Sequence, residues 1–93
     1  MSVVVVGGND RMVTRYKEIC KAYRCKAKVF TQLTTDFEHQ LGNPDFMVIF
    51  TATCSHKIVN TANRKCKQLN IPVARIHSSG ASALKNVLEQ YCK

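Results

Sequence analysis

An apolar run, Ser2-Val3-Val4-Val5-Val6, ends in the pair Gly7-Gly8. A short continuous run of apolar residues is typical of a strand that is buried on both faces, as strands of a parallel sheet are. The two glycines predict a sharp turn out of this strand, because glycine adopts backbone angles that other residues avoid. We therefore expect residues 2–6 to form a strand of a parallel sheet and residues 7–8 to form the turn after it.

The rest of the chain alternates between strand and helix patterns. Three further strands are predicted at residues 26–30, 46–50 and 73–76. Apolar residues at spacings of three and four predict helices at residues 11–24, 34–41 and 55–69, and a last helix that begins after Ser78 or Ser79. This alternation predicts a three-layer α/β domain with a four-stranded parallel sheet in the order 2-1-3-4, right-handed crossovers, and helices on both faces.

Length and composition indicate one globular domain over residues 1–93, with 45% hydrophobic and 22% charged residues. A chain this short buries only about 60 to 65 per cent of its unfolded surface, so we expect further burial in a homodimer. No stretch approaches the roughly 18 apolar residues of a membrane span, and no signal-peptide pattern is present, so we expect a cytoplasmic protein without a membrane partner.

The formal net charge is +8, from 14 Lys and Arg residues against 6 Asp and Glu residues. Such an excess attracts phosphorylated metabolites and nucleic acid, although a basic solvated surface explains it equally well. Nucleic-acid binding by the basic face takes third place among the functions considered. Tyr16 and Tyr23 are both predicted to be buried, which leaves no aromatic surface for stacking bases.

Three polar turns follow predicted strands, at residues 7–10, 51–56 and 77–80. If the strands are parallel, these turns meet at the carboxyl edge of the sheet, where open α/β folds bind ligands. The turns and the helix starts beside them supply the candidate ligand-binding residues: Gly7, Gly8, Asn9, Arg11, Arg15, Thr53, Cys54, His56, Ser78, Ser79 and Gly80.

An anion is one candidate ligand at this edge. Gly7 and Gly8 would leave backbone N–H groups near a helix N-terminus, Arg11 and Arg15 lie beside them, and the 78–80 turn resembles an anion-binding nest. The complete G-x-G-x-x-G pattern is absent, because position 12 is Met. A tight glycine turn and simple helix capping explain the same residues without a ligand.

A metal ion or haem is another candidate. Cys54 and His56 stand where a buried strand gives way to a helix, and His77 follows the neighbouring strand, so together they could ligate zinc, iron or haem. A small buried thiol and a hydrogen-bonded turn histidine are the simpler alternatives. An enzyme with Cys54 as nucleophile and His56 as base is less well supported, because these side chains diverge at a helix start and no carboxylate is evident nearby.

The five cysteines form an odd set without a C-x-x-C pair, which favours reduced thiols. Cys20 and Cys66 are expected in the core. Cys66 would lie on an inward stripe with Ile58, Val59, Ala62 and Leu69. Cys25 and Cys92 fall near element ends, where we expect exposure.

Several short motifs occur in an order that resembles the bacterial family called domain of unknown function 2325. They are Val5-Val6-Gly7-Gly8, Tyr16, Asp45, Ser55-His56, residues 64–67, Asn70-Ile71-Pro72 and residues 78–80. The resemblance implies a small Rossmann-like domain without a settled activity. It also implies haem binding by some relatives, which here would fall on Cys54, His56 and Cys66. Residues 31–34 depart from the His-Gly-type turn expected after the second strand.

We therefore expect a Rossmann-like, non-catalytic protein that binds a small ligand at the carboxyl edge. The sharpest form is haem or a metal held by Cys54 and His56, with Arg11, Arg15 or Lys57 pairing with propionates and with a redox- or gas-sensing role. The alternative is a phosphate- or nucleotide-binding module that uses the Gly7-Gly8 and 78–80 turns.

Overall fold

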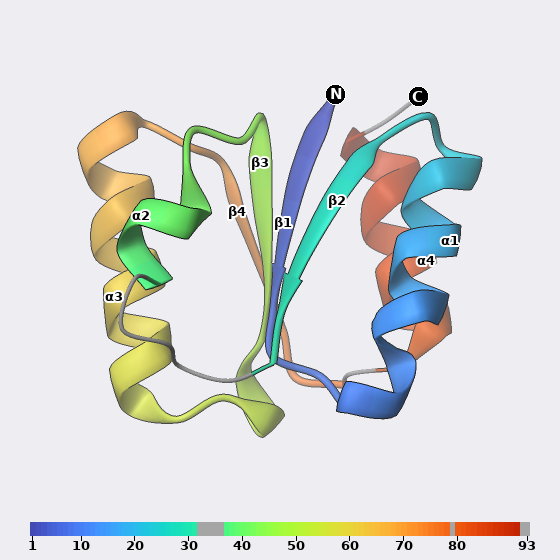
Figure 1. Cartoon of the computed structure of the whole chain (residues 1–93), viewed down its shortest axis with the longest axis horizontal. Helices are drawn as coiled ribbons and strands as arrows, with labels where there is room; N and C mark the ends of the chain where they lie inside the picture. Colours follow the sequence, from blue (N-terminus) through green and yellow to red (C-terminus); the bar gives the residue numbers. More distant parts are fainter. Residues whose placement is uncertain (32–36, 79, 92–93) are drawn as a thin grey trace.

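The strands and their order match the prediction. A computed structural model describes residues 1–31, 37–78 and 80–91. In it, parallel strands form a sheet in the order β2-β1-β3-β4 (Figure 1). The strands are β1 (Ser2–Val6), β2 (Lys26–Phe30), β3 (Phe46–Phe50) and β4 (Val73–Ile76). Every described strand has the bounds that the sequence predicted, because apolar runs between glycine, proline and polar turns are the strongest strand signals.

Helices cover both faces of the sheet. One face carries α1 and α4, and the other carries α2 and α3 (Figure 1). Their bounds are α1 (Val13–Ala22), α2 (Phe37–Leu41), α3 (His56–Leu69) and α4 (Ala81–Tyr91), with short 3-10 turns at η1 (Asp10–Met12) and η2 (Thr51–Thr53). The predicted start of the second helix at residues 34–36 lies outside the described residues. None of the described helices is both long and apolar enough to cross a membrane.

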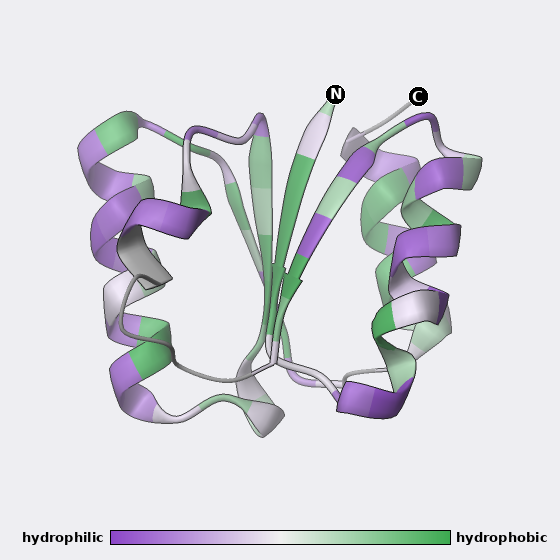
Figure 2. Ribbon diagram, in the orientation of Figure 1, coloured by the Kyte–Doolittle hydropathy of each residue, from purple (hydrophilic) through white to green (hydrophobic). Residues whose placement is uncertain are grey.

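The sheet divides the core into two apolar clusters. Alternate residues of β1 point to opposite faces, so Val3 and Val5 pack toward α1 and α4 while Val4 and Val6 pack toward α2 and α3. Every residue of β3 is buried. Figure 2 shows hydrophobic residues concentrated along β1 and β3 and hydrophilic residues on much of the helices. Each fully buried Val, Ile or Phe contributes about 1.5–3 kcal/mol, so these central strands hold the layers together.

Helix ends correct several exposure predictions. Cys25 is buried, not exposed, because a left-handed residue, Arg24 (φ 59°), ends α1 in a Schellman-type turn. In this turn the Cys25 N–H donates to the Cys20 carbonyl at 2.9 Å, which brings Cys25 back onto the core. Leu69 is 41% exposed because it is the last residue of α3, beyond the contact with the sheet.

Two tyrosines are less buried than predicted, because each lies at a helix end. Tyr23 is half-buried, and its hydroxyl donates to Glu89 at 3.1 Å. Tyr91, which was predicted to share one face of the last helix with Leu84, Val87 and Leu88, is 40% exposed and stacks on Phe46 with ring centroids 5.0 Å apart. Tyr16 is fully buried, as predicted.

Candidate functional site

The turns after β1, β3 and β4 all open at one edge of the sheet, as parallel strands require (Figure 1, lower edge). This edge also holds the starts of α3 and α4. It divides into a half beside β1 and β2 and a half beside β3 and β4. The two halves differ in how their polar groups are used.

Backbone donors of the glycine turn are already engaged. The Gly7 N–H donates to the Phe30 carbonyl at 2.7 Å, and the Gly8 N–H donates to Thr53 Oγ1 at 2.7 Å. Thr53 Oγ1 in turn donates to the Phe50 carbonyl at 3.1 Å. These bonds tie the turn after β1 to β2 and to the turn after β3, so the N–H groups of both glycines hold the fold.

Both glycines have conformations and surroundings that exclude larger residues. Gly7 has φ 95° and Gly8 has φ 88°. A Cβ atom on Gly7 would lie 2.5 Å from Cys54 Sγ, and one on Gly8 would lie 2.7 Å from the Tyr16 ring. The chain's own atoms therefore occupy the space beside this turn, which agrees with the simpler interpretation of Gly7-Gly8 as a structural turn.

The neighbouring basic residues lie beside an acidic one. Arg11 is exposed, and its N–H donates to the Asn9 side chain at 2.9 Å, so Asn9 caps the 3-10 turn η1. Arg15 is 3.9 Å from Glu18. Asp10 accepts a hydrogen bond from the Thr31 hydroxyl. The carboxylate side chain of Asp10 therefore lies at the half of the edge beside β1 and β2.

Cys54 is half-buried and packs against the buried apolar cluster on the face of the sheet that α2 and α3 cover. Burial raises the pKa of its thiol, so the neutral thiol is favoured over the thiolate that would bind a metal. His56 and His77 are both exposed. Among the described residues, no three His, Cys, Asp or Glu side chains lie together in a way that could hold a metal ion.

Cys66, the third residue that the family resemblance suggested for haem, lies in the core. It is 4% exposed, and its Sγ donates to Met47 Sδ at 3.5 Å. Burial raises the pKa of its thiol as well. Cys66 therefore lies in the core, whereas His56 is exposed at the sheet edge, and haem or metal ligation by Cys54 and His56 stays a prediction.

The half of the edge beside β3 and β4 holds unused donors. Ser55 caps α3: its Oγ accepts from the Ile58 N–H at 3.3 Å, and its carbonyl accepts from the Val59 N–H at 3.1 Å. Within the described residues, no acceptor contacts the N–H groups of His56 and Lys57. The first N–H groups of a helix have no partner inside the helix, so they point toward whatever lies beyond its end.

Several polar residues are exposed at this edge of the sheet. His56, Lys57, His77 and Ser78 are all exposed, and Ser78 Oγ accepts from the Gly80 N–H at 3.3 Å. Ser79 lies outside the described residues. The sequence holds no Asp or Glu between Asp45 and Glu89. Lys57 was predicted to pair with haem propionates and to belong to a basic group, although its place two residues after the helix cap was also a signal for a local anion site.

Comparison with known proteins identifies the family and the fold. The family profile described as "Uncharacterized protein conserved in bacteria (DUF2325)" matches residues 2–91. No curated protein matches the chain. One de novo designed Rossmann fold protein has a TM-score of 0.66 at 12% identity, over 97% of this chain and 95% of the design. A second has a TM-score of 0.59 at 8% identity, over 99% and 96%.

The two designs are similar in fold alone, and their low identity transfers no ligand to this chain. They confirm that the sheet and its helices make a small Rossmann-like domain. The family profile covers all the described helices and strands. The chain belongs to the bacterial family of uncharacterized proteins described as DUF2325.

Proposed function

We propose that this protein is a non-catalytic module that binds the phosphate group of a small molecule at the carboxyl ends of β3 and β4. One observation carries the proposal: the N–H groups of His56 and Lys57, at the start of a 14-residue helix, have no acceptor within the described residues. Such groups, together with the positive end of the helix dipole, form a favourable place for an anion.

The charges around these donors support the same ligand. The Lys57 ammonium adds a positive charge beside the helix start, and the first turn of α3 contains no acidic residue. Ser78, in the turn after β4, is an exposed hydroxyl residue at the same edge of the sheet. This proposal keeps the 78–80 turn of the sequence-based phosphate hypothesis and replaces Gly7, Gly8 and Arg11 with the start of α3.

Isothermal titration with inorganic phosphate and with adenosine monophosphate tests the proposal. Lys57→Gln should weaken the binding of both about tenfold, because a hydrogen bond to a charged group contributes roughly 1.5–3 kcal/mol. Lys67→Gln is the matched control, because Lys67 is an exposed lysine in the last turn of the same helix. Equal losses in the two variants would show only a general effect of charge and would contradict a local site.

A second candidate is binding to a nucleic-acid backbone along α3. This helix carries Lys57, Arg64, Lys65 and Lys67 without an acidic residue. Arg75 of β4 donates to Asn63 of α3, with Nη2 3.0 Å from Oδ1, which adds a further positive charge to this surface. Binding of duplex DNA that falls steeply with salt and is weakened equally by Lys57→Gln and Lys67→Gln would favour this candidate.

The cytoplasmic location and the homodimer stay predictions. Cys20, Cys25, Cys54 and Cys66 form no disulfide, which is compatible with a reducing compartment. Among the described residues, the large apolar side chains that remain exposed are Met1, Leu69 and Tyr91. Sedimentation equilibrium would measure whether two chains associate.

A further inference from the structure

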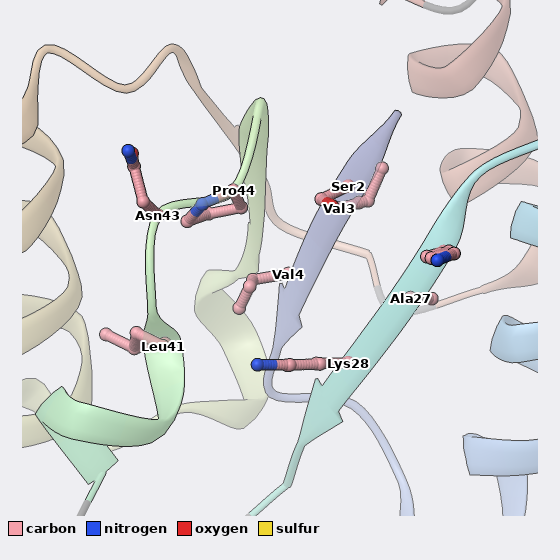
Figure 3. A pocket seen from close by; sticks show the side chains of 9 residues that line it. Ser2, Val3, Val4, Ala27, Lys28, Leu41, Asn43 and Pro44 are labelled. Carbon is pink, nitrogen blue, oxygen red and sulfur yellow. The ribbon is translucent and has the colours of Figure 1, made fainter.

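A hollow of about 180 Å³ lies at the opposite end of the sheet from the proposed phosphate site (Figure 3). It lies beside β1 and β2, next to the described end of α2. Buried apolar side chains of Val4, Leu41 and Pro44 line it. Its volume is below the range of about 300–1,000 Å³ usual for drug-sized ligands, so a small metabolite fits it better than a nucleotide or haem.

Two lysines of β2 make one side of the hollow positive. Lys26 and Lys28 are two residues apart, so they point to the same face of the sheet, and both are exposed. No carboxylate of the described residues contacts Lys26 or Lys28. The ion pair that the described residues contain joins Arg15 and Glu18, both on α1. Asp45, next to Pro44, accepts a hydrogen bond from the Ser2 N–H at 2.6 Å.

The Lys28 side chain lines the hollow and extends toward α2. Its Nζ donates to the Gln40 carbonyl at 3.4 Å, and Figure 3 shows it extended from β2 toward Leu41. An ammonium group has three N–H donors, so this bond leaves others for a ligand. Lysines on an edge strand also discourage pairing with other chains, but that role needs only their charge and not a fixed position over an apolar surface.

We propose that this hollow binds a small organic anion with a short aliphatic part. The carboxylate or phosphate end would contact Lys28 and Lys26, and the aliphatic part would pack on Val4 and Leu41. Burying the aliphatic part supplies affinity, and the charge pair fixes its orientation. This site is separate from the phosphate site at the start of α3, so neither proposal depends on the other.

Titration of the isotope-labelled protein with butyrate, followed by amide chemical shifts, tests the inference. We expect saturable shifts at Val4, Leu41 and Asn43 with a dissociation constant of about 1 mM, a range usual for weak ligands. Butyl phosphate, titrated separately, distinguishes a phosphate ester from a carboxylate as the preferred anion. Binding of either one supports the inference, and binding of neither overturns it.

Matched variants separate a site from general charge effects. Lys28→Met keeps the aliphatic stem and should weaken binding about tenfold or more, because it removes a charge-assisted hydrogen bond. Lys17 is an exposed lysine on α1, and Lys17→Met should leave butyrate binding unchanged. Equal shifts with butanol, or equal losses in the two variants, would overturn the inference. The Lys57→Gln variant should bind butyrate normally. The butyrate titration can therefore be interpreted even if the phosphate proposal fails.

Discussion

At the scale of single residues, Gly7 and Gly8 do more than form a turn. Their positive φ angles turn the chain out of β1, and their lack of a side chain lets Cys54 and Tyr16 pack against the backbone. The Thr53 hydroxyl then joins the turns after β1 and β3. A side chain at Gly7 or Gly8 would therefore disturb the contact between two turns as well as one backbone angle.

Gly7→Ala should destabilise the fold by roughly 3 kcal/mol or more, from the positive φ together with overpacking. The new Cβ would lie 2.5 Å from Cys54 Sγ and 3.0 Å from the Phe50 carbonyl oxygen. Gly42→Ala is the control, because Gly42 has φ 62° but its Cβ would meet nothing closer than Lys28 Nζ at 3.8 Å. It should cost only about 1 kcal/mol. Urea denaturation measures both, and equal costs would contradict the packing argument.

Burial at Cys20 predicts a dependence of stability on pH. Burial, with the neighbouring Cys25 as a smaller cause, raises the pKa of the Cys20 thiol to about 11. Because the folded pKa lies above the unfolded value of about 8.5, the stabilising contribution is complete below pH 8.5 and is lost as pH rises toward 11. The free energy of unfolding should fall over this range, and it should fall less in Cys20→Ala. Parallel pH profiles for the two proteins would contradict the assignment to Cys20.

At the scale of elements, left-handed residues end two helices. Asn70 (φ 54°) follows α3, and Arg24 (φ 59°) follows α1. Asparagine tolerates this conformation, whereas arginine adopts it at a cost of roughly 1–2 kcal/mol. Arg24 is exposed and keeps this angle because the turn brings Cys25 into the core and starts β2.

Arg24→Gly should therefore stabilise the protein by about 1 kcal/mol, which is the opposite of the usual effect of glycine. Lys21→Gly, three residues earlier in α1, should destabilise it by about 1 kcal/mol, because glycine weakens a helix interior. Thermal unfolding of the two variants checks the pair. A loss of stability in Arg24→Gly would show that its side chain has a role beyond the backbone turn.

Sequence patterns predicted the positions of strands and helices better than the exposure and hydrogen-bond partners of single residues. Apolar runs predicted the strands, and apolar spacing over residues 55–69 predicted α3, which Ser55 and Asn70 cap, because these signals are local. Exposure at Cys25 was predicted wrongly, because it depends on how the chain folds back after Arg24. The use of the Gly7 and Gly8 amides also could not be predicted, because their acceptors, Phe30 and Thr53, lie far along the chain.

At the scale of the whole molecule, the two edges of the sheet offer different chemistry. The carboxyl edge beside β3 and β4 combines the start of α3 with a region of sequence that lacks acidic residues. The amino edge holds a small hollow with an apolar lining and two lysines. The charge of +8 is consistent with the two proposed anion sites and with a general attraction for polyanions.

The most direct test of the central claim is an amide chemical-shift titration with inorganic phosphate. The account predicts saturable shifts that are largest at His56 and Lys57, with smaller shifts at His77 and Ser78. These shifts should need about tenfold more phosphate in Lys57→Gln and the same phosphate concentration in Lys67→Gln. Shifts centred on Gly7 and Gly8, or spread evenly over the lysines of α1 and α3, would contradict a phosphate site at the start of α3.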